Sequence, residues 1–207
     1  MRSNVRIFPP EWNQGDHWRV AMKTENPVTA DFRPSYAEHV FDLRVLAIPA
    51  VRIATYAVEA RSQDFAGVTF TLYYRRDDFS LEKVTRRDLS QSEETIIFNG
   101  NHPFIYYERR LPVIPDFPVG ELREAAGSRK FTVAGQEVIQ EVQVSKEAAK
   151  ITLQRIEPPG SLRVDIEWAA GNPWWSKIEC SENPPPNAPF EGQIVASGYL
   201  LTGSGQP

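Results

Sequence analysis

The sequence predicts an all-β fold, a single domain over residues 1–207 with a mostly antiparallel sheet arranged as a half barrel or a sandwich. Three observations predict it. Short segments alternate apolar and polar side chains, which is the period of a strand. Gly, Pro, Asn and Asp separate these segments, as they do in turns. The hydrophobic content of 41% is sufficient for a core.

The clearest strand covers residues 162–168, where four apolar side chains alternate with three charged ones. A break follows at Gly171, Asn172 and Pro173, because Gly and Asn tolerate positive φ and Pro cannot donate a ladder hydrogen bond. The alternation resumes at Trp174, Ser176, Ile178 and Cys180, which predicts a hairpin with 174–180 as its second strand.

The other elements follow in order from the N-terminus. Residues 1–17 are a lead-in, with Trp12 against the domain surface, and 25–39 are a loop. Residues 203–207 are a frayed tail, and 121–126 are the only expected helix. Besides the hairpin, strands are expected over 18–23, 40–48 (with Ala47 inward), 53–61, 68–75, 81–86, 131–133, 138–144 (with Val144 inward), 151–156 and 193–201.

One long connection, residues 99–120, mixes prolines with aromatic side chains. Its prolines forbid a central strand, and its aromatics argue against an exposed linker. We expect an ordered cover over the sheet, either as a permanent closure or as a lid over a pocket. The prolines are Pro103, Pro112, Pro115 and Pro118.

Charge and hydropathy exclude some classes of partner. Lys and Arg number 23 against 27 Asp and Glu, a net charge of −4 without a basic cluster, so a nucleic-acid footprint is absent. No segment has the length of apolar sequence that a membrane span requires. The N-terminus lacks the apolar region of a secretory signal, which predicts the cytoplasm as the sequence stands, or the bacterial envelope if a leader has been removed.

Residues capable of catalysis are few, and we expect no enzyme, cofactor or metal. His17, His39 and His102 lack metal-ligand spacing, and a single cysteine excludes a Cys-rich site. A Cys–His hydrolase would require an exposed, activated Cys180, whereas its position in the alternation points inward. The arginine pairs 86–87 and 109–110 suit either a solvent-facing strand or an anionic head group.

The order of several motifs carries a family resemblance. W-N-Q-G-D-H-W comes first, then Y-A-V-E-A, T-F-T-L-Y-Y-R-R-D-D-F-S-L-E-K-V-T-R-R and, late in the chain, W-A-A-G-N-P-W-W-S-K-I-E. Over about half of its length the chain resembles bacterial DUF3108-like proteins and, more distantly, lipoprotein carriers of the LolA and LolB type. The resemblance implies a strongly curved half barrel whose apolar concave face accepts acyl chains. The chain lacks the acylatable N-terminal Cys of lipoproteins.

These observations leave two main hypotheses for function. The first is a non-catalytic protein that binds an apolar or amphipathic, lipid-like molecule on the sheet. The second is a structural module with a filled core that meets a protein partner through its sheet edges or the N-P-P-P loop at 183–186. The candidate ligand contacts are Phe70, Leu72, Tyr74, Ile166 and Trp168 on the sheet, with Phe104 and Tyr106 on the covering segment.

Overall fold

The computed structural model describes residues 11–26, 35–47, 55–76, 81–90, 92–97, 127–133, 136–145, 147–157, 162–183 and 194–202. Its strands are β1 (His17–Asn26), β2 (Ser35–Val45), β3 (Thr55–Arg61), β4 (Thr69–Arg75), β5 (Leu81–Arg87), β6 (Glu93–Ile97), β7 (Gly127–Val133), β8 (Gln136–Val144), β9 (Ala148–Arg155), β10 (Leu162–Ala169), β11 (Lys177–Glu182) and β12 (Ile194–Thr202). A 3-10 turn, η2 (Gln63–Phe65), joins β3 to β4.

These strands form one antiparallel 12-stranded sheet in the order β6-β5-β4-β3-β2-β1-β12-β11-β10-β9-β8-β7. The chain starts in the middle at β1, reaches one edge at β6, resumes at the opposite edge with β7 and returns to the middle at β12. Because β6 and β7 are the two ends of the order, the sheet does not close. The described strands thus form one open sheet and not the two separate sheets of a sandwich, which favours the half barrel.

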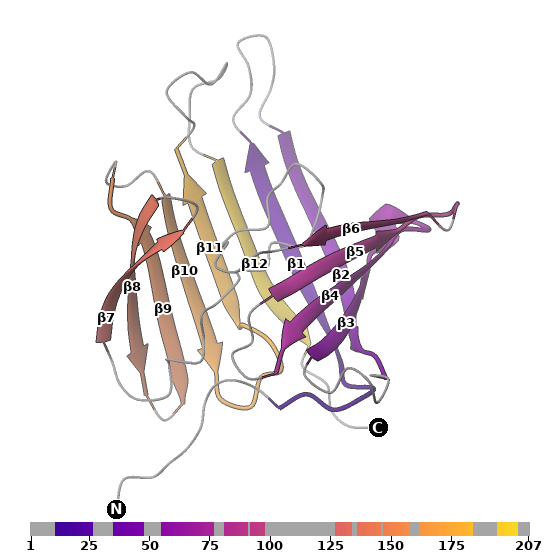
Figure 1. Ribbon diagram of the computed structural model, residues 1–207, viewed down its shortest axis with the longest axis horizontal. Helices are drawn as coiled ribbons and strands as arrows, with labels where there is room; N and C mark the ends of the chain where they lie inside the picture. Colours follow the sequence, from indigo (N-terminus) through magenta and orange to yellow (C-terminus); the bar gives the residue numbers. More distant parts are fainter. Residues whose placement is uncertain are drawn as a thin grey trace, which may run out of the picture.

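Twist and bulges give the sheet its curvature. Figure 1 shows β3 to β6 running across the direction of β10, β11 and β12, so the two halves of the sheet enclose a concave, inner face. The register shifts between Arg19 and Val20 in the β1–β12 ladder and between Tyr73 and Tyr74 in the β4–β5 ladder. Such irregularities bend a strand and increase its local twist.

The inner face is the hydrophobic core. Alternate residues of nearly every strand are buried there, and their neighbours in sequence face outward with charged side chains. In β10 the pattern is complete, since its even-numbered residues are at most 3% exposed. The core residues of the strands include Trp18, Val20, Met22, Phe41, Leu43, Val58, Phe70, Leu72, Leu81, Val84, Val138, Val142, Ile151, Leu153, Val164, Ile166 and Ile178.

The prediction of an all-β, antiparallel sheet is confirmed, with corrections to its elements. The expected loop over 25–39 is wrong at both ends, because β1 continues to Asn26 and β2 begins at Ser35. The strand β6 was not expected, because E-E-T-I-I shows no alternation. Ala47 and Val144, expected inward, are exposed because they lie beyond or at the end of a strand. The cover at 99–120, the helix at 121–126 and the tail at 203–207 lie outside the described residues.

Candidate functional site

The sheet residues expected to contact a ligand all lie on the inner face. Phe70, Leu72 and Tyr74 are buried on β4, and Ile166 and Trp168 are buried on β10. Five strands separate β4 from β10 in the sheet order. Phe104 and Tyr106 belong to the part of the chain that the structure does not describe.

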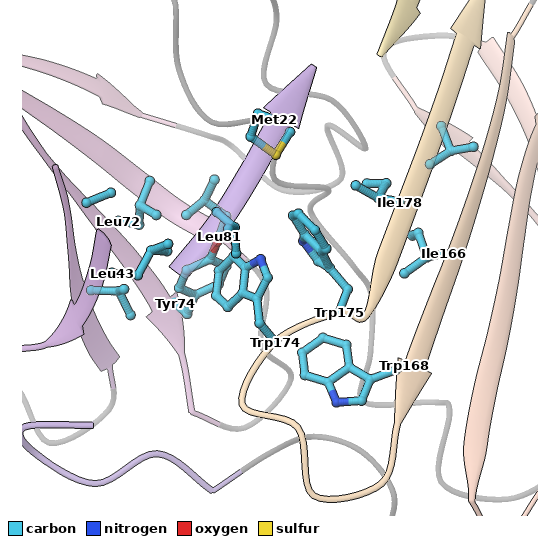
Figure 2. Close-up of a cluster of buried hydrophobic side chains, with 14 of the residues drawn as sticks. Met22, Leu43, Leu72, Tyr74, Leu81, Ile166, Trp168, Trp174, Trp175 and Ile178 are labelled. Atoms are coloured by element: carbon cyan, nitrogen blue, oxygen red, sulfur yellow. The ribbon is translucent and has the colours of Figure 1, made fainter. Parts of the chain in front are cut away.

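The connection between β10 and β11 brings these two groups into one site. We call residues 170–176, A-G-N-P-W-W-S, the Trp loop. Figure 2 shows Trp174 and Trp175 reaching from this loop into the space between Leu72 and Tyr74 on one side and Ile166 and Ile178 on the other. Both tryptophans are buried, at 3% and 1% exposure. The predicted strand over 174–180 is therefore wrong in its first residues, since β11 begins at Lys177.

Backbone and side-chain hydrogen bonds fix the Trp loop. Gly171 has a φ of 82°, a conformation that favours glycine. Ser176 N donates to Glu167 O at 2.7 Å, and Leu200 N donates to Ser176 O at 3.1 Å. Ser176 Oγ accepts from Ala169 N and from Asn172 Nδ2, both at 3.0 Å. The loop is tied in this way to β10 and β12, and both of its indoles are held on the inner face.

Trp174 is the centre of an aromatic cluster formed by Trp12, Trp18, Trp174, Trp175, Tyr56 and Tyr74. Its ring stacks on Trp12 with centroids 5.6 Å apart and meets Tyr74 edge-on at 6.0 Å. The Trp18 and Trp175 rings lie 5.2 Å and 6.1 Å from the Trp174 ring between centroids. Trp12, which was expected to lie against the domain surface, packs more deeply, inside the cluster, and is 6% exposed.

The five indole N–H groups divide into two sets. Trp12 Nε1 donates to Pro173 O at 2.7 Å, and Trp168 Nε1 donates to Asn172 O at 3.1 Å, so the Trp loop supplies both acceptors. Nε1 of Trp18, Trp174 and Trp175 is buried, and within the described part of the chain no acceptor lies within hydrogen-bonding distance of these three atoms. Buried donors are normally satisfied in folded proteins. Three unsatisfied donors in one cluster therefore make this part of the inner face a candidate binding site.

The groups considered for catalysis are kept apart by the register. Cys180 is buried on β11 and pairs with Ala196 of β12. His39 lies on β2, three strand spacings or about 14 Å away along the sheet. Its Nδ1 lies 3.1 Å from Asp64 Oδ2. His102 lies outside the described residues.

A serine beside this His39–Asp64 pair does not complete a catalytic triad. Ser62 Oγ lies 3.3 Å from the same carboxylate oxygen, Asp64 Oδ2, and also accepts from Asp64 N as the cap of η2. A triad needs the hydroxyl on the second nitrogen of the imidazole. The hydroxyl and the imidazole instead share one acceptor, which is a structural arrangement at the start of a turn.

The outer face carries paired charges. Lys150 and Glu167, Arg163 and Asp165, and Lys177 and Glu179 form ion pairs of 2.6 to 2.9 Å across or along β9, β10 and β11. Arg86 and Arg87 pair with Glu94 and Glu93 of β6, which favours the solvent-facing interpretation of these arginines. Such pairs on a solvated face contribute little each to stability.

The carboxyl group of Asp165 is the most constrained charge on this face. Partial burial acts to raise its pKa, but hydrogen bonds from Arg163 and Thr152 and the charges of Arg163 and Lys150 outweigh it, so the pKa lies below its ordinary value of 3.8. Thr152 Oγ1 donates to Asp165 Oδ1 at 2.7 Å. These contacts join β9 to β10.

One open hollow of about 370 Å³ lies on the outer side of β1, β2 and β3, lined by Gly15, His17, Asp42, Leu43, Arg44, Glu59 and Arg61. Its charges are partly neutralised, because Asp42 pairs with Arg19 at 2.9 Å and Glu59 with Arg61 at 2.9 Å. Among the described residues, no group of three His, Cys, Asp or Glu side chains is placed to hold a metal ion. No helix within the described ranges has the length and apolarity to cross a membrane.

Sequence reasoning identified the inner-face residues of β4 and β10 but missed the centre of the site. Trp12, Trp18, Trp174 and Trp175 were not proposed as site residues, although the pair W-W after N-P was a usable signal. Two successive large aromatics cannot both face inward in a strand, so their adjacency favours a loop that turns both onto one face.

Comparison with known proteins adds little to this description. No family model matches the sequence, and no curated protein matches it significantly. Among solved structures, the fold is similar to that of a DUF1329 family protein from Desulfovibrio piger, with 9% sequence identity and a TM-score of 0.41 over 93% of this chain and 88% of that chain. A likeness at this level carries no inference about function. The resemblance to DUF3108, LolA and LolB proteins stays a prediction.

Proposed function

We propose that this protein is a non-catalytic binding protein that holds an apolar or amphipathic, lipid-like molecule on the inner face of its half barrel. The observation that carries the proposal is the extent of that face. Buried apolar side chains lie on this face from β5, with Leu81 and Val84, to β8, with Val138 and Val142, while the central β12 contributes Gly198 and the partly buried Leu200. Sites for apolar ligands are lined predominantly by apolar side chains of this kind.

The topology supports the proposal. The inner face is enclosed by the two halves of one open sheet, and the described strands include no second sheet that packs on it. The half barrel also agrees with the architecture that the LolA and LolB resemblance implies. Carriage of acyl chains is part of the proposal and rests on this agreement of architecture together with the apolar face.

A filled core is the second candidate, and the Trp loop favours it. Trp174 and Trp175 occupy the inner face beside Met22, Ile178 and Tyr74 with contacts typical of a packed interior. In that case the protein would be an interaction module, and its sheet edges β6 and β7 would meet a partner by strand addition.

Native mass spectrometry distinguishes the two candidates. Freshly purified protein is measured intact, then after solvent extraction, and the extract is analysed for acyl lipids. The binding protein should show an added mass that extraction removes, and the extracted protein should regain thermal stability when the lipid is returned, because a ligand that binds only the folded state stabilises it. An unliganded protein whose melting temperature is indifferent to lipids would reject the proposal and leave the interaction module.

A pair of matched variants ties the binding to the inner face. Val142 and Val144 lie on the same strand, β8, at 7% and 41% exposure. Val142→Thr exchanges a methyl group for a hydroxyl on the inner face and should weaken binding by about 1 kcal/mol, or about fivefold. Val144→Thr makes the same exchange at an exposed site and should leave the affinity unchanged. Equal effects would place the ligand elsewhere.

A further inference from the structure

Three buried donors on the inner face require an acceptor. Trp18, Trp174 and Trp175 are 1%, 3% and 1% exposed, so bulk water does not reach them. Among the described residues none accepts a hydrogen bond from their Nε1 atoms. A buried N–H without a partner costs free energy in any folded protein, so such groups require an explanation such as a bound molecule.

The two satisfied tryptophans provide an internal comparison. Trp12 and Trp168 belong to the same region, and the carbonyl groups of Pro173 and Asn172 accept their protons. The Trp loop therefore supplies the carbonyl acceptors for Trp12 and Trp168. It also carries two donors of its own, Trp174 and Trp175. The division separates the two indoles that reach carbonyl groups of the Trp loop from the three that do not.

The rings that carry the three donors are neighbours in the cluster. Trp18 and Trp174 are 5.2 Å apart between ring centroids, and Trp174 and Trp175 are 6.1 Å apart. In Figure 2 the nitrogen atoms of Trp174 and Trp175 lie on the sides of the rings that face each other. The far end of the Trp175 ring, Cη2, instead packs toward β12, where it lies 2.6 Å from an added Cβ of Gly198.

The donors are neutral, and this decides the chemistry of the acceptor. Among the described residues, a cation contacts a ring of the cluster at Tyr56, where the guanidinium of the exposed Arg76 lies 4.5 Å from the ring centroid. A buried carboxylate or phosphate without a paired cation is costly. A carbonyl oxygen has two acceptor lone pairs and no charge to desolvate.

We propose that the indoles of Trp18, Trp174 and Trp175 bind the neutral ester group of an acyl lipid whose chain lies on the apolar inner face, with two donors on the lone pairs of the carbonyl oxygen and the third on the second ester oxygen. This inference rests on the proposed function and specifies its ligand class. The acyl chain supplies apolar contact, and the carbonyl group fixes the position of the chain end at the Trp loop.

The test uses three probes of equal chain length on the delipidated full-length protein: monopalmitoylglycerol, palmitate and hexadecane. The chain has 5 tryptophans, so a ¹H–¹⁵N spectrum shows five indole signals, assigned through single Trp→Phe variants. Monopalmitoylglycerol should move the signals of Trp18, Trp174 and Trp175 downfield and leave those of Trp12 and Trp168 in place. Hexadecane should bind without these downfield shifts.

Affinity gives a second readout that tolerates changes in packing. Trp175→Phe removes one donor and some ring area, so it should lower the affinity for monopalmitoylglycerol about five- to tenfold more than that for hexadecane. Trp168→Phe removes a donor that Asn172 already satisfies and should leave the ratio of the two affinities within about twofold of wild type.

The outcomes separate this inference from the proposed function. Equal affinity ratios in wild type and Trp175→Phe, or indole signals that stay in place while the ester binds, would overturn the carbonyl site and leave the binding protein intact. If palmitate bound more tightly than monopalmitoylglycerol and caused larger indole shifts, the acceptor would be an anion, and the assignment of a neutral acceptor would be overturned. If none of the three probes binds, the proposed function itself fails.

Discussion

Trp175 lies directly against the backbone of Gly198 on β12. A Cβ atom at position 198 would be 2.6 Å from Trp175 Cη2, 2.6 Å from Met22 Sδ and 3.0 Å from Ile178 Cγ2. The indole thus occupies the space that a side chain at position 198 would need. The relationship joins the Trp loop to the central strands, and it explains why a glycine is suited to the middle of a strand.

Gly198→Ala should destabilise the protein by about 1 to 3 kcal/mol, the usual cost of overpacking a core, measured by urea unfolding. Ser197→Ala on the same strand is the control and should change the unfolding free energy by less than about 0.5 kcal/mol. In the background of Trp175→Phe the alanine should cost less, because the smaller ring leaves space. A neutral Gly198→Ala would show that Trp175 does not pack on β12.

Alternation predicted the faces of the strands because it reports burial directly. In β10 and β4, each apolar residue of the alternating pattern lies on the inner face. A shift of the strand register by one residue would expose all of these apolar side chains, so the register is strongly specified. The antiparallel sheet followed from the number of short strands and turns. The topology that brings the first strand, β1, beside the last, β12, depends on pairing over almost the whole chain, and local patterns carry no signal for it.

The site was harder to predict because its key contacts are not periodic. Trp12 joins the cluster through a hydrogen bond to Pro173, 161 residues away in sequence. The strand β6 forms by backbone pairing with β5, and its own sequence does not alternate, so local pattern gave no signal for it. Gln140, with 0% exposure between Val138 and Val142, was missed because a polar residue on an inner face breaks the expected pattern.

Cys180 should be inert to thiol reagents in the native protein. It is 7% exposed on the inner face, and a buried thiol in apolar surroundings forms little of the reactive thiolate. Labelling with a disulfide reagent should be slow in buffer and complete in guanidinium, and Cys180→Ser should leave lipid binding unchanged. Rapid labelling of the native protein would return the Cys–His hydrolase to consideration.

Asp165 should make stability depend on pH at the acid end. Its folded-state pKa lies below the ordinary 3.8, so its contribution is complete above that pH and is lost as the pH falls through the lower folded value. The unfolding free energy of wild type should therefore fall below pH 4 more steeply than that of Asp165→Asn. The pKa is read from the carboxyl ¹³C signal, and Thr152→Val should raise it. Parallel pH profiles for the two proteins would contradict this role.

Ser176 should control the position of the Trp loop. Its hydroxyl oxygen accepts from Ala169 N and Asn172 Nδ2, so Ser176→Ala leaves two donors without their acceptor and should destabilise the protein by about 1 to 3 kcal/mol. Hydrogen exchange locates the effect. The amides of Ala170 and Ser176, which donate to Glu147 and Glu167, should exchange faster, whereas those of β1 should keep their protection.

The matched control for this variant is Ser145→Ala, at the turn between β8 and β9. Ser145 Oγ also accepts from two backbone donors, Glu147 N and Ala148 N at 3.3 and 3.0 Å, but it is exposed to water. Water can replace the hydroxyl there, so the loss of stability should be smaller than at Ser176, and the aromatic cluster should be unaffected. Tryptophan fluorescence should shift only in Ser176→Ala, because only that variant loosens Trp174 and Trp175. An unchanged spectrum with an unchanged exchange rate at Ala170 would mean that the backbone bonds alone hold the loop.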